Sequence, residues 1–472
     1  TVRMGVYDMP DERKVHKIPI PRVGGLAIAI GVFLAMFLWT DQINFLKAYI
    51  IASAVIVLFG IVDDVKNLDY KVKFLSQIAA ALIMIFYGGV QIKNLGDFLP
   101  YDTQLTEWLA IPLTLFIIVG VTNAINLSDG LDGLAGGVCT LSFCCVAYLA
   151  YISGNMVVVL ISLALTGATF GFLRFNTHPA SLFMGDSGSQ FLGFSLVSTS
   201  LYLTQDKTAL SPLLPLLICG FPVLDTLGIM LYRISKGGSP FKPDKKHFHH
   251  RLMRIGLYHS EAVFSIYLIH ALLIVSAYLF RFYSEWILLT GYMIFASGVG
   301  SLFFIMERKQ FKWRRNPALD RIIKPWMKTI RQKGILIMIS FRTVEYGIPL
   351  ITLITCFLPR SIPPSSSVLS ALAILSIIII WLLKRNWLRI VIAPTLYILL
   401  LLVVWLSSTD PRFPADYYNF EWIYNCSFLV LVLFVILTLK LTRRRKGFKV
   451  TPMDFLIIFI ALTCYLPILA VL

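Results

Sequence analysis

Residues 47–64 read KAYIIASAVIVLFGIVDD, an apolar stretch that ends in two adjacent aspartates. A helix needs about 20 apolar residues to cross the hydrocarbon core of a bilayer, and this stretch is close to that length. Similar runs recur along the 472 residues, of which 57% are hydrophobic, and the mean hydropathy is +0.78. A soluble core could not bury so much apolar surface. The sequence therefore predicts an all-α, polytopic transmembrane protein.

About fifteen membrane spans are expected from the length and composition of the apolar runs. They lie at residues 25–40, 47–62, 74–90, 108–124, 133–153, 156–173, 189–204, 212–232, 261–281, 285–306, 335–358, 367–383, 389–407, 427–441 and 453–472. The span at 335–358 has the weakest pattern because Arg342 and Glu345 interrupt it. The seven cysteines lie in or beside these spans without metal-ligand spacing, which indicates small core residues.

The net charge of +17 is distributed unevenly between the two sides of the predicted helices. If the first loop is cytoplasmic, strict alternation places nearly all Lys and Arg residues on that side, as the positive-inside rule requires. The exceptions are Lys47, Lys93, Lys207, Arg281, Arg360 and Arg412, with Arg342 ambiguous. The basic residues lack the interleaved aromatic residues of a nucleic-acid stacking platform. We expect a cell-membrane protein, the inner or cytoplasmic membrane, with its polar loops facing the cytoplasm and no nucleic-acid partner.

Three parts of the chain are expected. Residues 1–306 form a transmembrane domain of about ten spans, whose long polar loops all lie on the cytoplasmic side. Residues 307–334 form a basic cytoplasmic linker. Residues 335–472 form an additional transmembrane helical region of unknown role, because its loops contain no cluster of residue types suited to catalysis.

The first two cytoplasmic loops contain candidate phosphate and metal ligands. The first reads RKVHKIPIPRVGG at 13–25, and its Arg22 lies at a helix entrance, where a phosphate could bind. The simpler explanation is a positive-inside loop with a turn. Asp63 and Asp64 begin the second loop and point about 100° apart if they are helical, so they should have different roles. A solvated helix end is the alternative. Lys73 follows them.

The third and fourth loops carry further aspartates between glycines. Residues 123–137 read NAINLSDGLDGLAGG, and neighbouring members of the set Asn126, Asp129 and Asp132 would share a face of a helix. The twelve-position pattern of a soluble calcium loop, which ends in Glu, is missing. Residues 175–193 read FNTHPASLFMGDSGSQFLG and place Asp186 where a span begins. This position suits either a Mg²⁺ ion shared with a phosphate or a capping aspartate.

The fifth loop is basic and rich in histidine. Residues 233–257 read RISKGGSPFKPDKKHFHHRLMRIGL, which includes His247, His249, His250 and Arg251. Diphosphate binding fits better than zinc, because no fixed fourth ligand is present and the surrounding Lys and Arg would repel a cation. A solvated basic loop is the alternative. Asp225 lies inside the preceding span, where a charge is normally paired, with Arg233 as one possible partner.

The aspartates of these loops should meet, because the loops share one side of the membrane. Two carboxylates about 4 Å apart repel by roughly 4 kcal/mol at an effective dielectric near 20. A Mg²⁺ ion would let several remain ionised beside a diphosphate, with Mn²⁺ as the alternative ion. The expected aspartates are Asp63, Asp64, Asp129, Asp132 and Asp186, and the expected diphosphate ligands are Arg22, Lys73, His249, His250 and Arg251.

The motifs resemble the polyprenyl-phosphate N-acetylhexosamine-1-phosphate transferases, a branch of glycosyltransferase family 4. The matching runs are PIPRVGG, DDVKNLDYKVKFLSQ, NAINLSDGLDGLAGG, FNTHPASLFMGDSGS and HFHHRL, in the family's order and within residues 1–306. The resemblance implies that undecaprenyl phosphate or another polyprenyl phosphate attacks the β-phosphorus of a UDP-sugar and releases UMP. This reaction is a first membrane step in making a cell-envelope glycan.

The resemblance also implies roles for individual residues. Asp63, Asp64 and Asp186 would be catalytic. Asp186, Asp64 and Asn126 would bind the metal. The substrates would contact Arg22, Lys73, Asn126, Asp129, Asp132, His247, His249, His250 and Arg251. Family members usually have one more helix before the first motif, so the chain is expected either to be trimmed at its N-terminus or to begin late. The first residues show no signal-peptide pattern.

Two alternatives concern the substrate and the class of protein. The sequences of the PRVGG and HHRL motifs resemble the branch that uses UDP-N-acetylglucosamine as the donor more than the branch that uses the muramyl-pentapeptide donor. A secondary transporter would also carry membrane carboxylates, but near the midplane, whereas here all except Asp225 lie at one face. The sequence does not determine the oligomeric state, so an oligomer is compatible with it, and it assigns no role to the extension after residue 334.

Overall fold

The structure is a computed structural model that describes residues 7–8, 19–39, 43–100, 103–205, 208–239, 247–309, 335–357 and 364–383, with positions 427, 430, 431 and 434. The chain divides into two compact units, Thr1–Asn316 with Thr451–Leu472, and Pro317–Val450. Most of the expected linker, and the expected spans at 389–407, 427–441 and 453–472 apart from these single positions, lie outside the described residues.

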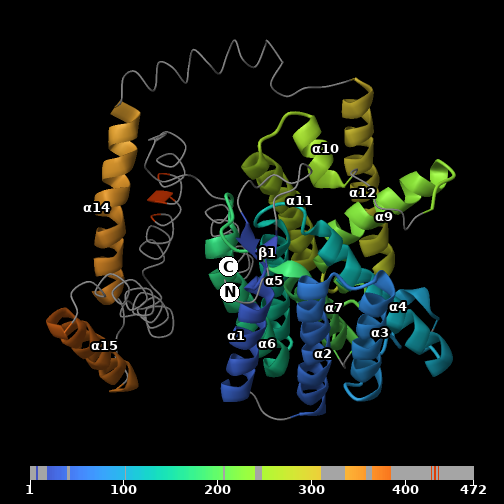
Figure 1. Cartoon of the computed structure of the whole chain (residues 1–472), viewed down its shortest axis with the longest axis horizontal. Helices are drawn as coiled ribbons and strands as arrows, with labels where there is room; N and C mark the ends of the chain where they lie inside the picture. The colour runs from blue at the N-terminus through green and yellow to red at the C-terminus, as the bar shows by residue number, and fades with distance from the viewer. Residues whose placement is uncertain are drawn as a thin grey trace. The chain divides into compact units, whose positions relative to one another are not determined.

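The first unit is built from helices that run largely side by side (Figure 1). They are α1 (Gly24–Trp39), α2 (Asn44–Lys66), α3 (Tyr70–Phe86), α4 (Glu107–Ser128), α5 (Leu134–Ile152), α6 (Met156–Asn176), α7 (Gly185–Gln205), α8 (Leu214–Ile218), α9 (Gly220–Ser235), α10 (Phe248–Arg254), α11 (His259–Leu279) and α12 (Glu285–Arg308). A 3₁₀ turn, η1 (Gly96–Phe98), follows α3. Two-residue strands β1 (Tyr7–Asp8) and β2 (Ile20–Pro21) pair antiparallel.

A helix is present at each expected span within the described residues, and one expected span is divided. The predicted helix at 212–232 is interrupted at Cys219, between α8 and α9. Pro222 has no backbone N–H, so the carbonyl of Ile218 lacks its usual helical donor. The Ser142 hydroxyl of α5 donates to that carbonyl instead, at 2.8 Å. Inside a membrane a freed carbonyl needs such a partner, which explains how this break is tolerated.

Six of the described helices are long and apolar enough to cross a membrane. They are α2, α4, α5, α6, α11 and residues Glu285–Met306 of α12, and α1 contributes a shorter apolar segment, Gly24–Phe37. Large apolar side chains on the outer surface of these helices are exposed, such as Phe37 at 77% and Phe116 at 74%. Surfaces of this kind suit lipid better than water. The chain is therefore a helical, multi-pass membrane protein.

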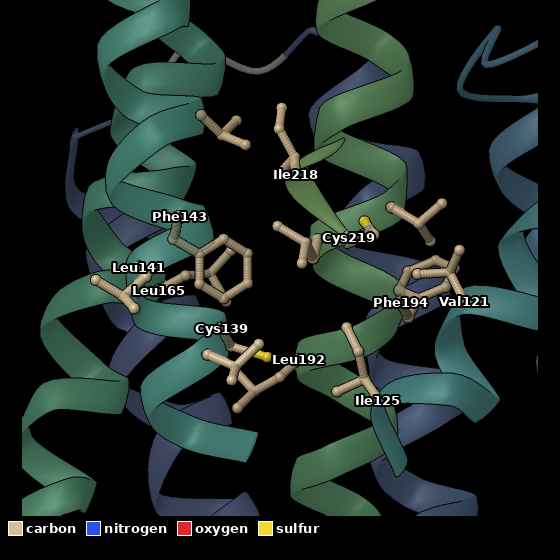
Figure 2. Close-up of a cluster of buried hydrophobic side chains, with 14 of the residues drawn as sticks. Val121, Ile125, Cys139, Leu141, Phe143, Leu165, Leu192, Phe194, Ile218 and Cys219 are labelled. Atoms are coloured by element: carbon tan, nitrogen blue, oxygen red, sulfur yellow. The ribbon is translucent and has the colours of Figure 1, made fainter. Parts of the chain in front are cut away.

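Helix α7 occupies the centre of the first unit. Every residue from Ser187 to Leu201 is buried, and α7 packs against α1, α2, α4, α5, α6 and α8. Apolar side chains from these helices form the surrounding core, including Val121, Phe143 and Phe194 (Figure 2). Because protein surrounds α7, its many hydroxyls and amides are tolerated. The packing of these helices around α7 also fixes the position of its N-terminal end, where Asp186 lies in the first turn.

The second unit contains two described helices, α14 (Ile335–Phe357) and α15 (Pro364–Leu383). Both agree with expected spans, and α14 continues through Arg342 and Glu345. A segment of α15, Ser370–Ile380, is an apolar helix shorter than a full span. The division of function between residues 1–306, the linker and residues 335–472 stays a prediction.

Candidate functional site

The loops at one end of the first unit contact one another. The Phe183 amide donates to the carbonyl of Pro21 at 2.9 Å, and the Gly133 amide donates to Asn176 Oδ1 at 2.9 Å. A methyl group on Gly25 would overlap the backbone of Gly188, so the first motif loop approaches α7 closely. We call this end the motif face, defined by residues 19–25, 63–77, 123–137, 175–193 and 247–259.

The helix ends opposite the motif face form a second, separately bonded surface. Gln205 Oε1 accepts from the Asn94 amide at 2.9 Å. The buried carboxylate of Glu285 accepts from the Asp97 amide at 2.7 Å and from the Ser211 hydroxyl at 2.6 Å. We call this surface the far face, defined by residues 88–99, 205–213 and 281–285. These bonds use backbone amides and a hydroxyl, which indicates a structural role.

At the motif face, Lys73 connects two aspartates from different helices. Its Nζ lies 2.6 Å from Asp63 Oδ2 and 2.6 Å from Asp186 Oδ2. Asp63 is buried at 3% exposure, and its Oδ1 accepts from the Leu68 amide at 2.7 Å. Arg22 interacts electrostatically with Asp186. A cation shared by two carboxylates lowers their mutual repulsion, so Lys73 allows Asp63 and Asp186 to lie close together.

Asp64 has different partners from its neighbour Asp63, as their angular separation on a helix predicts. Its Oδ1 accepts from the Asp186 amide at 2.8 Å, and its Oδ2 accepts from the Ser187 amide at 3.2 Å and the Ser187 hydroxyl at 2.7 Å. These amides belong to the first turn of α7, whose N–H groups lack helical acceptors. Asp64 therefore caps α7 and fixes where Asp186 stands.

Gly185 allows this cap to form. Its φ is +70°, a conformation that residues with a Cβ rarely adopt, and an added Cβ would meet the Asp64 carboxylate.

Replacing Gly185 by Ala is expected to lower stability by about 1–3 kcal/mol through backbone strain alone, and more through the collision with Asp64. The displaced aspartates should also reduce activity. Thermal unfolding in detergent measures the first effect. Gly171→Ala is the matched control, because among the described residues no atom outside the adjacent backbone of its own helix lies within 4 Å of the added methyl group. Equal melting temperatures for both variants would contradict the role assigned to Gly185.

The third loop does not form one helical face, because α4 ends at Ser128. Asn126 Oδ1 accepts from the Ser189 hydroxyl at 2.6 Å, which ties α4 to α7. Asp129 is the C-cap residue of α4 and is half-buried. No side chain or amide of the described residues donates to the Asp129 carboxylate. Burial raises its pKa to about 7, and the charges of Asp186 and other nearby aspartates add to that increase.

The raised pKa of Asp129 predicts a pH dependence for the metal-free protein. The folded carboxyl holds its proton up to about pH 7, whereas the unfolded one loses it near its ordinary value of 3.8. Stability from this group is therefore present below pH 3.8 and is lost as pH rises through 7. Melting temperatures measured with a chelator from pH 5 to 8 should fall for the wild type and fall less for Asp129→Asn. Parallel curves for the two proteins would contradict this assignment.

Asp132 differs from Asp129 in being well partnered. Its Oδ2 accepts from His178 Nδ1 at 2.7 Å and from the Ala180 amide at 3.1 Å. Burial would raise the pKa of Asp132, but these hydrogen bonds outweigh burial and hold its pKa below the usual value. The Asp132 amide donates to His259 Nε2 at 3.1 Å. Asp132 therefore presents a fixed, ionised carboxylate.

Within the basic loop, Phe248–Arg254 form the short helix α10, which lies beside α11 (Figure 1). His249 is buried, and its Nε2 packs against the backbone of Gly130 in the third loop. Burial, with a contribution from neighbouring His250, lowers the pKa of His249 to about 3, so this ring is neutral at physiological pH. Positive charge on this side must come from residues such as Arg251, whose guanidinium lies 5.9 Å from the centroid of the Tyr232 ring.

His247 and Asp225 contact each other. His247 Nδ1 lies 2.9 Å from Asp225 Oδ2, and the Phe248 amide donates to Asp225 Oδ1 at 2.8 Å. Asp225 thus holds the first turn of α10, with His247 where the sequence suggested Arg233. A contact between His247 and substrate stays a prediction.

Sequence reasoning missed several residues of the motif face. Gln77, Asn123 and Gln190 bond one another through their side-chain amides and join α3, α4 and α7. Ser187 completes the cap, and Asn176 joins two loops. His178 and His259 surround Asp132. All of these residues except His259 lie within the quoted motif runs. Their positions there were a signal, but serine and amide side chains are common in membrane helices and do not by themselves indicate a site.

Comparison with known proteins identifies the family. The model of glycosyl transferase family 4 matches residues 46–204. A Bacillus subtilis (strain 168) protein named "Probable undecaprenyl-phosphate N-acetylglucosaminyl 1-phosphate transferase" is 41% identical over 292 residues, 61% of this chain and 80% of the relative. Proteins named undecaprenyl-phosphate alpha-N-acetylglucosaminyl 1-phosphate transferase are 32% identical in Yersinia pestis and 31% in Escherichia coli (strain K12), each covering 62% of this chain and 82% of the relative. The chain belongs to glycosyl transferase family 4, which confirms the resemblance of its motifs.

Proposed function

We propose that the protein transfers N-acetylglucosamine-1-phosphate from UDP-N-acetylglucosamine to undecaprenyl phosphate and releases UMP. The observation that supports this most strongly is the meeting of Asp63, Lys73 and Asp186 beside Asp129 on the motif face of a multi-pass membrane protein. The names of its relatives supply the substrates. The distribution of Lys and Arg supports a cytoplasmic motif face, where a soluble nucleotide sugar is available.

The residues of the motif face fit a divalent cation. Asp129 is half-buried, accepts no hydrogen bond from a described residue and lies close enough to Asp186 for their charges to interact. Hard carboxylate oxygens of this kind suit Mg²⁺ or Mn²⁺. Asp186 remains the first candidate ligand. The oxygens of Asp64 and Asn126 already accept hydrogen bonds, so Asp129 is the better second ligand. When bound, the ion would offset the negative charge of the donor diphosphate.

The chemistry requires the lipid phosphate and the donor to be aligned. An oxygen of the lipid phosphate forms a bond to the β-phosphorus of the donor, the bond from that phosphorus to the bridging oxygen breaks, and UMP leaves with the electron pair. Lys73, which pairs with Asp63, would bind a phosphate oxygen, and Asp63 would anchor Lys73 or take a proton from the lipid phosphate. His250, Arg251 and Arg22 would bind the remaining diphosphate charge. Positioning and charge stabilisation of this type account for most phosphoryl-transfer catalysis.

UMP release tests the proposal. Purified protein in detergent receives undecaprenyl phosphate, Mg²⁺ and one UDP-sugar at a time. UDP-N-acetylglucosamine is expected to support release, and omission of the lipid phosphate should stop it. Faster release with UDP-muramyl-pentapeptide would assign the protein to the other branch. Absence of UMP with every donor tested would contradict the proposed function.

A further inference from the structure

Two histidines outside the predicted site enclose Asp132. His178 comes from the loop after α6, and His259 is the first residue of α11. Their rings stack with centroids 4.1 Å apart and planes 18° apart. His178 is partly exposed, at 34% of its side chain, whereas His259 is exposed at only 9%. The pair therefore connects the third loop to the fourth loop and to α11.

The hydrogen bonds define what each ring does. The Asp132 amide carries a hydrogen, so His259 Nε2 must accept it and the His259 proton resides on Nδ1. His178 Nδ1 faces a carboxylate and must donate to it. Both donors to the carboxylate, His178 and the Ala180 amide, bind Oδ2. Within the part of the chain that the structure describes, Asp132 Oδ1 accepts no hydrogen bond.

We infer that His178 and His259 are positioning residues that hold Asp132 with its Oδ1 available as a hydrogen-bond acceptor for the nucleotide-sugar donor. This inference rests on the proposed function. His259 sets the backbone of residue 132 and His178 sets its side chain, so together they restrict both. An acceptor held in this way loses little conformational entropy when a donor N–H or O–H binds it.

A metal ion held by the same three side chains is the main alternative. Their ligand atoms lie within 4.8 Å of one another, which a small cation could bridge. However, the lone pair of His259 Nε2 already accepts from the Asp132 amide, and one Asp132 oxygen already has two donors. Binding of an ion would require these bonds to break. The hydrogen bonds of Asp132 form without an ion, and the buried Nδ1 of His259 has no hydrogen-bond partner among the described residues.

Matched substitutions separate hydrogen bonding from ring packing. His178→Phe keeps the stacked ring but loses the donor, whereas His178→Asn keeps an N–H close to the position of Nδ1. His259→Phe and His259→Gln form the corresponding pair for the acceptor. Each Phe variant is expected to raise KM for the UDP-sugar about 10-fold, because each removes one hydrogen bond that positions Asp132. The value of kcat and the KM for the lipid phosphate should change less than twofold, and Asn or Gln should restore most of the affinity.

A double-mutant cycle and a binding measurement complete the test. In an Asp132→Asn background, His178→Phe should add little, because it acts through Asp132. The inference would be overturned if the effects of the two substitutions on KM were fully additive, or if the Phe variants had an unchanged KM for the UDP-sugar. Tight Zn²⁺ binding by the wild type that both Phe variants abolish would also overturn it. UDP-sugar binding measured by calorimetry without acceptor keeps this test separate from the proposed reaction. A wild type that binds no UDP-sugar contradicts the proposed function, whereas equal binding by wild type and His178→Phe contradicts only the positioning role.

Discussion

Asp186→Asn is expected to release UMP about 1,000-fold more slowly than the wild type, since a bound metal ion contributes several kcal/mol of charge stabilisation. Asp186 lies in the first turn of the buried helix α7, and its carboxylate already attracts Lys73 at 2.6 Å. The neutral amide cannot neutralise a divalent cation, and it leaves Lys73 with one carboxylate instead of two. Initial rates at saturating donor and acceptor, across a range of Mg²⁺ concentrations, measure the effect.

The control for this prediction is Asp97→Asn. Asp97 is exposed on the far face, and only its backbone groups take part in the hydrogen bonds found there. The same chemical change should therefore leave the rate within about twofold, because it touches neither core nor site. Wild-type turnover by Asp186→Asn, at any Mg²⁺ concentration, would remove Asp186 from the metal site.

Lys73→Met is expected to slow UMP release by at least about 100-fold, because a cation aimed at transferring phosphate typically contributes several kcal/mol. It should also destabilise the metal-free protein. Removing one partner from a fully buried ion pair costs about 3–5 kcal/mol. Lys73 is 29% exposed, so screening by solvent reduces the expected cost to about 1–2 kcal/mol. Asp63 and Asp186 would then repel each other without an intervening charge.

Added Mg²⁺ should raise the melting temperature of Lys73→Met more than that of the wild type, because the ion would replace the missing positive charge between Asp63 and Asp186. This measurement requires no turnover. Lys71→Met is the matched control, since Lys71 is exposed two residues away on the same helix. If Lys71→Met and Lys73→Met behave alike in both assays, the ion pairs of Lys73 have no functional role.

Local sequence was sufficient to predict the helices and the sharing of one face by the motifs. Length and apolar composition decide whether a segment crosses a bilayer, and both are properties of the segment alone. Successive spans cross the membrane in opposite directions. Counting them places Asp64 and Asp186, which are 122 residues apart, at the same face. Local composition was less informative for α7, whose serines and threonines are compatible with a central helix only because other helices cover it.

Tertiary structure decided the pairing of the polar groups. Asp63 and Asp64 are equivalent by composition, yet one binds Lys73 and the other caps α7. Asp225 is held by His247, and the sequence suggested Arg233. Such choices depend on how each helix is rotated about its axis and on where its last turn ends. Packing against distant segments sets both.

The sequence by itself thus determined that this is a multi-pass helical membrane protein with aspartates gathered at one end of its helices. The tertiary structure alone decided which carboxylate of the predicted site accepts no hydrogen bond from the described residues, which two share Lys73 and which is held by two histidines. The physical reason is the distance over which each interaction acts. Hydrophobic burial acts on whole segments and can be summed along the chain, whereas a hydrogen bond or ion pair requires atoms within about 3–4 Å. Only the packed helices bring those atoms together.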